Sequence, residues 1–253
     1  MLAPSFKNHA LGDLQLLPQL LQYNAQQSPE HLWFVHGSSP DDLKPITWAE
    51  AGLAFKRAAQ LVHTHLKAAR QENGEPPVVG ILGNIGTSDA HSVPQYIVTS
   101  SNPTDTITYH TLYSGILTAG GTAFLISTRN SSAAVAHLLK ETGTHTLFVS
   151  TDEVIQGLAS SALASARNEG HHVDLISAPT FHQLFSEDME NKGLESLLDY
   201  PKPTPDSPAI ILHSSGQARH PFQSVSRLIA IKDRPLSPNP RLSLTDLFSN
   251  GRN

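Results

Sequence analysis

Short apolar runs alternate with amphipathic helical patterns along most of this chain, and that alternation restricts its fold more than any other feature. The runs fall at residues 78–82, 122–126, 146–149, 173–176 and 209–212. A strand without polar alternation is buried on both faces, which is typical of parallel sheets covered by helices. The sequence therefore predicts an α/β fold in which a parallel sheet is flanked by helices.

Helical patterns fill the gaps between these runs. Thr47 and Glu50 form a capping-box pattern, a hydroxyl followed three residues later by a carboxylate, which predicts the start of a long amphipathic helix. We expect Ser132 to cap a later helix. The helix expected over residues 152–168 should turn Val154 inward, with leucines on the same face.

Composition excludes several classes of function. The 253 residues carry 17 Lys and Arg against 22 Asp and Glu, so the net charge is −5 and no basic stripe indicates nucleic-acid binding. Cysteine is absent, which excludes disulfides, thiolate zinc sites and a cysteine nucleophile. We see no secretory leader and no run of ~18 apolar residues that would indicate a membrane span. We expect a soluble, cytoplasmic protein of unspecified oligomeric state with no membrane partner.

The fourteen histidines do not form a metal-binding motif. No H-E-x-x-H occurs, and His63 and His65 lie two residues apart, which places their rings on different helix faces. We interpret the histidines as surface or packing residues, and Trp33, Trp48 and Phe55 as core residues. The sequence gives no catalytic residue and no metal ligand.

The strongest chemical signal is the apolar run 209–212, which leads into His213, Ser214, Ser215 and Gly216. Hydroxyls and successive backbone N–H groups after a strand can surround a phosphate, and glycine lets the backbone approach it closely. Ser214, Ser215 and Gly216 are therefore candidate phosphate-binding residues. By spacing alone, an ordinary strand-to-helix turn explains such residues more often. Neither G-x-x-x-x-G-K-[ST] nor G-x-S-x-G occurs in the sequence.

Two segments depart from the alternation. Residues 84–104 carry scattered Ser, Thr, Asn and Pro without a period, and a loop of roughly 20 structureless residues is uncommon inside a compact domain. Residues 217–253 spread prolines among Arg and Ser. We expect an atypical insertion at 84–104 and an irregular tail after residue 216 that is not part of the domain.

Seven segments, taken together and in order, resemble the N-terminal part of an adenylation (AMP-dependent synthetase/ligase) domain of the adenylate-forming superfamily. The segments are Ile46–Glu50, Val79–Leu82, Asp105–Tyr109, Gly115–Gly120, Ile126–Ser131, Ala134–Leu139 and Ile211–Gly216. The likeness is nearest to fungal NRPS-like adenylate-forming (carboxylic acid) reductases and covers residues 10–216. It implies a partial N-terminal lobe of such an enzyme.

The resemblance also implies a chemistry. The family activates a small carboxylic acid with ATP and Mg²⁺, forms an acyl-adenylate and releases pyrophosphate. In a full-length reductase, the acyl group then passes to a phosphopantetheine thiol and is reduced with NADPH. Ser214, Ser215 and Gly216 would be the ATP-binding residues.

This chain departs from the family pattern after Gly216. The family's phosphate loop reads [ST]-S-G-[ST]-T-G-x-P-K; here Pro221 matches, but Phe222 stands at the lysine position. The acyl pocket, the adenine and ribose motifs, the hinge and the C-terminal catalytic lysine are not found either. We predict a chain that derives from an acyl-adenylate-forming enzyme but is inactive. The alternative is a non-catalytic fragment or interaction module with at most residual nucleotide binding.

One hypothesis accounts for both departures. Residues 84–104 would be translation of a retained intron, and the segment after Gly216 would follow a frameshift or a missed splice site. A lobe that ends there leaves sheet edges and apolar helix faces without partners, which favours aggregation. We therefore expect marginal stability.

Overall fold

The computed structural model describes residues 16–37, 41–66, 76–83, 104–188, 194, 207–213 and 223–227. The helices are α1 (Leu17–Gln27), α2 (Trp48–Leu66), α3 (Thr104–Thr118), α4 (Ser132–Glu141), α5 (Glu153–Asn168) and α6 (Phe181–Phe185). The strands are β1 (Leu32–His36), β2 (Lys44–Thr47), β3 (Val78–Leu82), β4 (Thr122–Ile126), β5 (Thr146–Val149), β6 (Asp174–Ser177), β7 (Pro208–His213) and β8 (Gln223–Arg227).

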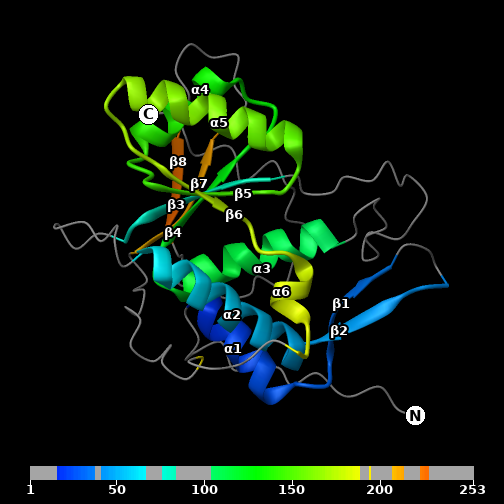
Figure 1. The fold of residues 1–253 in the computed structure, drawn as a ribbon. Helices are drawn as coiled ribbons and strands as arrows, with labels where there is room; N and C mark the ends of the chain where they lie inside the picture. The colour runs from blue at the N-terminus through cyan, green and yellow to red at the C-terminus, as the bar shows by residue number, and fades with distance from the viewer. Residues whose placement is uncertain are drawn as a thin grey trace, which may run out of the picture.

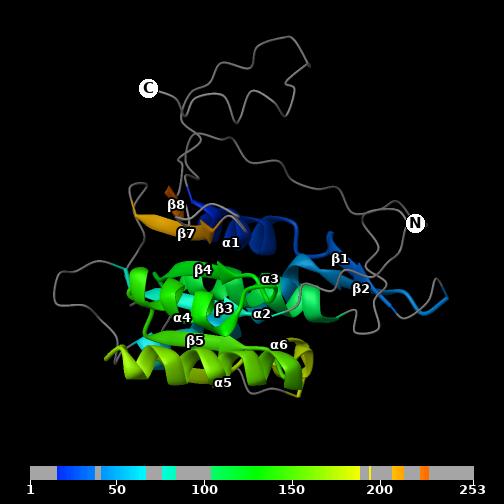
Figure 2. The same ribbon diagram turned by 90° about the horizontal axis from the view of Figure 1, so that it is seen from above.

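The main sheet has the strand order β6-β5-β3-β4-β7-β8. Its first five strands run parallel, and β8 pairs antiparallel with β7. Helices α1, α2 and α3 lie on one face of the sheet, while α4 and α5 lie on the other (Figures 1 and 2). The predicted α/β architecture, a parallel sheet between two helical layers, is confirmed.

Strand β3 is the centre of this sheet. It pairs in parallel with β4 on one side and β5 on the other, and Gly80 lies opposite both Phe124 and Leu147. Because successive side chains alternate across a strand, Val79 and Ile81 join the core under α2 and α3, while Leu82 joins the core under α4 and α5. Burial on both faces is the reason why the run is continuously apolar.

Two details of the helices differ from the prediction. Residue Ser131 caps α4, where its side chain accepts a hydrogen bond from Ala134 N, and Ser132 is the first helical residue. In α5, Val154 is 82% exposed and the buried stripe starts at Ile155 instead. The stripe continues through alanines, which let the helix pack closely but carry little hydrophobic signal in a sequence.

Strand β8 is a correction to the expected irregular tail. Its residues 223–227 pair with β7 from Pro208↔Arg227 to His213↔Gln223. The alternation Gln-Ser-Val-Ser-Arg is too polar for a buried strand, but it suits an edge strand with one neighbour. The remainder of 217–253, like residues 84–103, lies outside the described residues.

An aromatic cluster joins the β1–β2 hairpin to the helices. The Trp33 ring lies 5.3 Å from Phe55 edge to face and 6.3 Å from Phe185 in a stacked arrangement. His110 of α3 lies 5.7 Å from Trp33, and burial among these rings lowers its pKa. The cluster confirms Trp33 and Phe55 as packing residues, and it seats α6 against α2 and α3.

Helices α2 and α3 approach each other at Gly115. A Cβ placed on Gly115 would lie 2.5 Å from Cβ of Ala58 and 2.9 Å from the backbone nitrogen of Ala59. Backbone atoms cannot move aside as a flexible side-chain end can. The close contact of the two helices therefore depends on glycine at this position.

We predict that Gly115→Ala lowers the free energy of unfolding by about 1–3 kcal/mol, because the added methyl overpacks the helix contact. Gly157→Ala is the matched control: Gly157 is also in a helix, and nothing lies within 4 Å of its would-be Cβ. That variant should stabilise the protein by about 0.4–1 kcal/mol. Urea denaturation measures both, and equal effects of the two substitutions would contradict the packing argument.

Candidate functional site

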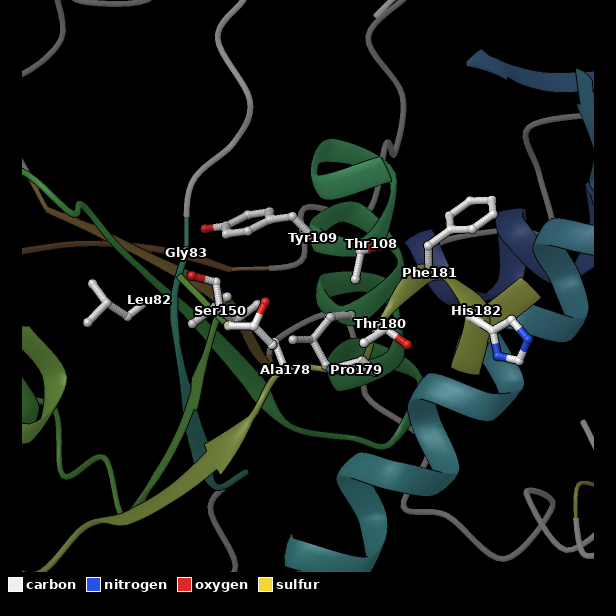
Figure 3. Close-up of a pocket in the computed structure, with 13 residues that line it drawn as sticks. Leu82, Gly83, Thr108, Tyr109, Ser150, Ala178, Pro179, Thr180, Phe181 and His182 are labelled. Carbon is white, nitrogen blue, oxygen red and sulfur yellow. The ribbon is translucent and has the colours of Figure 1, made fainter. Parts of the chain in front are cut away.

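A cavity of about 390 Å³ opens at the carboxyl ends of β3, β5 and β6, beside α3. Its size falls within the range of small-molecule sites. The lining residues are Ile81, Leu82, Gly83, Thr108, Tyr109, Leu112, Ser150, Thr151, Ala178, Pro179, Thr180, Phe181 and His182 (Figure 3).

Strand topology explains why a cavity forms here. The helix that follows β3 in the chain, α3, lies on one face of the sheet, and the helix that follows the adjacent β5, α5, lies on the opposite face. Connections that diverge from neighbouring strands leave a crevice at their carboxyl ends, and open α/β sheets bind ligands at such switch points. Gly83 and Ser150 are the first residues after these two strands.

The inner wall of the cavity is formed by Gly83, Ser150 and Tyr109 (Figure 3). A Cβ on Gly83 would lie 3.6 Å from Cβ of Ser150 and 3.7 Å from Cδ2 of Tyr109, so the three residues are in contact range. Burial raises the pKa of Tyr109 to about 12. The phenol is therefore neutral at any physiological pH and can donate a hydrogen bond.

The outer wall is the segment that leads into α6. Thr180 caps this helix: its backbone nitrogen donates to Oε1 of Gln183 at 2.8 Å, and its hydroxyl accepts from Gln183 N at 3.3 Å. Phe181 stacks on Phe185 with ring centroids 4.6 Å apart. Arg57 of α2 completes the support, because its Nη1 donates to the Leu184 and Ser186 carbonyls at 2.7 and 3.0 Å.

The described lining contains hydroxyls, a phenol, an imidazole and apolar side chains, but no Lys, Arg, Asp or Glu. Such walls suit recognition of a ligand through hydrogen bonds and apolar contact. Across the part of the chain that the structure describes, no group of three or more His, Asp or Glu could hold a metal ion.

Ser214, Ser215 and Gly216 lie outside the described residues, so the structure does not place them relative to the cavity. Their attachment point is described, because Ser214 follows the last residue of β7. Since β7 runs parallel to β4, it ends at the same edge of the sheet as β3 and β5. Two strand spacings, roughly 10 Å, separate β7 from β3 along this edge.

Sequence reasoning missed the cavity. Polar or small residues directly after buried runs, such as Gly83 and Ser150, were the available signal, because carboxyl ends of parallel strands meet at one edge. These residues predict a shared site only when the strand order is known. His182 and Thr108 come from other elements and give no sequence pattern.

Comparison with known proteins identifies the origin of this fold. A search against models of protein families finds no match. The chain is 32% identical over 218 residues to the adenylate-forming reductase Nps10 of Heterobasidion annosum, an alignment that covers 83% of this chain and 18% of that protein. It is 26% identical over 225 residues to the adenylate-forming reductase Nps9 of Serpula lacrymans, covering 86% and 17%.

The chain belongs to the adenylate-forming superfamily. It matches the N-terminal part of an adenylation domain, and it spans less than a fifth of the length of these curated relatives. Members of the superfamily use ATP and Mg²⁺ to convert carboxylic acids into acyl-adenylates, and the resemblance seen in the sequence is confirmed at the level of family.

Solved structures agree on the fold. A fatty acyl CoA synthetase of Mycobacterium tuberculosis superposes with a TM-score of 0.57 at 20% identity, covering 84% of this chain and 34% of the synthetase. The N-terminal subdomain of Klebsiella oxytoca NpsA gives a TM-score of 0.55 at 15% identity, covering 85% and 42%. The described residues therefore have the fold of the superfamily's N-terminal lobe.

No helix among the described elements combines the length and the apolar character that crossing a membrane requires.

We predict that Arg57→Gln loosens the outer wall of the cavity. Losing two charge-assisted hydrogen bonds should cost about 1–3 kcal/mol and speed amide exchange in α6, while α4 and α5 keep their protection. Hydrogen–deuterium exchange measures the effect. Lys56→Gln, an exposed neighbour on the same helix, is the control and should change stability by less than about 0.5 kcal/mol. Unchanged exchange in α6 would contradict this role of Arg57.

Proposed function

We propose that this chain is the first α/β lobe of an acyl-adenylate-forming domain, and that it does not form an acyl-adenylate by itself. The observation that carries the proposal is the 32% identity to an adenylate-forming reductase along most of the chain. The position of β7 supports it, because Ser214, Ser215 and Gly216 begin at the carboxyl edge of the sheet, where α/β proteins bind their ligands.

The proposed inactivity follows from the residues after Gly216. Transfer at a phosphate needs preorganised donors and positive charge where negative charge develops. In this chain Gln217 and Ala218 stand where the family has hydroxyls, and Phe222 stands where it has lysine. Ser214, Ser215 and Gly216 can still offer two hydroxyls and backbone N–H groups to the phosphates of ATP, with Mg²⁺ arriving on the nucleotide.

The alternative is a non-catalytic module that retains weak nucleotide binding. One observation favours it: His213 and Gln223 are paired across β7 and β8, so both ends of the intervening segment are held close together. A segment whose two ends are fixed close together loses less conformational entropy when it orders around an anion.

In a full-length parent, we propose that the acyl group of a small carboxylic acid passes to phosphopantetheine and that NADPH reduces it. The names of the two curated relatives, both adenylate-forming reductases, support adenylation and a reduction; phosphopantetheine and NADPH are what the resemblance implies. We also propose a cytoplasmic location, and no nucleic-acid or membrane partner, in line with the acidic charge balance. Oligomeric state stays open.

We predict that the chain as it stands supports no pyrophosphate exchange with a panel of carboxylic acids. Restoring the motif with Gln217→Ser, Ala218→Thr, Arg219→Gly and Phe222→Lys should let Mg²⁺–ATP raise the melting temperature by a few degrees. At a free ATP concentration ten times the dissociation constant, binding raises the free energy of unfolding by about 1.4 kcal/mol. Adding Ser215→Ala to the restored chain should reduce the shift. Robust exchange by the unmodified chain would overturn the proposed inactivity.

We also propose that residues 84–104 derive from a retained intron and that the reading frame or splicing changes after Gly216. Transcript reads aligned to the gene should skip the first stretch, and the DNA after the Gly216 codon should encode Ser/Thr-Gly-x-Pro-Lys in another frame. Reads that continue in frame through both stretches would refute the hypothesis. In that case 84–104 and 217–253 are genuine parts of this protein.

A further inference from the structure

Ser150 carries a hydroxyl that the fold does not use. Its backbone is fully engaged: the nitrogen donates to Leu82 O at 3.1 Å, and the oxygen accepts from Nε2 of Gln156 at 2.6 Å. The side-chain oxygen is buried and has no hydrogen-bond partner among the residues that the structure describes. Burying an unpaired hydroxyl costs free energy, and native proteins rarely keep one without a reason. Alanine would fill this position at the end of β5 without that cost.

The surroundings of Ser150 indicate what would pair with it. Ser150 lines the cavity, and serine has three staggered χ1 positions, so a turn of χ1 can carry the hydroxyl toward the cavity. The lining also includes Ile81, Leu112 and Phe181, which offer apolar surface. One water molecule occupies roughly 30 Å³ in the liquid. The cavity, at about 390 Å³, is therefore much larger than a single water molecule. A mostly apolar ligand with one polar group fits these walls.

Charge narrows the ligand class further. Among the described residues, no Lys, Arg, Asp or Glu lines the cavity, so an ionised ligand would lose hydration there without gaining a partner charge from these walls. A neutral ligand loses much less hydration free energy when it enters the cavity. The hydroxyls of Ser150 and Thr108 and the phenol of Tyr109 can donate to a carbonyl, an amide or an alcohol oxygen.

We propose that this cavity binds an uncharged, mainly apolar small molecule whose carbonyl, amide or hydroxyl group hydrogen-bonds to Ser150. The cavity lies at the carboxyl ends of β3, β5 and β6, whereas the proposed phosphate loop follows β7, on the far side of β4 from β3. The proposal goes beyond adenylate formation and does not rest on it. It holds equally if the chain binds no nucleotide.

A matched pair of probes tests the proposed ligand class. Benzamide and benzoate have nearly the same shape, but only benzoate is charged at pH 7.5; benzyl alcohol and 4-methylpentanamide extend the neutral set. Titration of the whole ¹⁵N-labelled chain should give saturable shifts of the Gly83, Ser150 and Thr151 amides with at least one neutral probe. Benzoate should bind at least ten-fold more weakly than benzamide.

Two variants connect binding to the cavity. Ser150→Ala should weaken the neutral probe roughly 3- to 10-fold, the worth of one hydrogen bond, and raise the melting temperature of the ligand-free chain by about 2–4 °C. Gly83→Leu should abolish binding, because a Cβ there already contacts Ser150 and Tyr109 and the longer side chain extends into the space. Gly157→Leu on α5 is the control and should leave binding unchanged.

Each outcome of these titrations either supports the proposed site or overturns it. Neutral probes that shift the three amides, with the losses expected for both variants, support the site. No saturable shift with any neutral probe overturns it, as does binding of benzoate equal to that of benzamide. If Gly83→Leu fails to fold, Ser150→Ala decides alone: higher stability together with unchanged probe affinity means that the hydroxyl serves no ligand, and the proposal fails.

Discussion

The parallel pairing of β3 with both β4 and β5 is the constraint on which the rest of this structure depends. Each parallel neighbour requires a crossover, and here the helices that follow β3 and β5 in the chain lie on opposite faces of the sheet. The strands pack closely at Gly80, where a Cβ would lie 2.7 Å from Cδ1 of Leu147 and displace that side chain. The same pairing fixes where Gly83 and Ser150 emerge, so the packing of one strand determines the position of the cavity.

The carboxyl edge of the sheet has two regions with different chemical characters. At β3 and β5 the cavity is lined by neutral side chains and is suited to an uncharged molecule. At β7 the sequence continues into Ser214, Ser215 and Gly216, the residues that we propose as phosphate contacts. Strand β4 lies between β3 and β7. The roles proposed for the two regions rest on different residues, so they can be tested by different variants.

Strands β3, β4 and β5 were predictable because burial on both faces imposes continuous apolar runs, and the parallel sheet followed from the spacing of the runs. The inward face of α5 was predictable only in part: Leu158 and Leu163 do pack against the core, but Val154 carries more hydrophobic signal than the alanines of the buried stripe and yet points outward. Val154 is 82% exposed although it is apolar, whereas Ala159 and Ala162 are fully buried. Small residues such as alanine let a helix pack close to its neighbours. Hydrophobicity alone does not show where such close packing occurs.

The family and the candidate site differ in what a sequence can reveal about them. Family membership is carried by ordered local segments, each readable from a few neighbours in the chain, and the resemblance is therefore visible in the sequence alone. The cavity is lined by residues that follow three different strands and by residues from two turns of α3. These residues lie close together only because of the strand order. Strand order is a long-range property, decided by which crossovers bury the most surface. A serine directly after a strand is common and by itself predicts no site. Ser150 indicates one only in the folded structure, where its buried hydroxyl has no hydrogen-bond partner among the described residues.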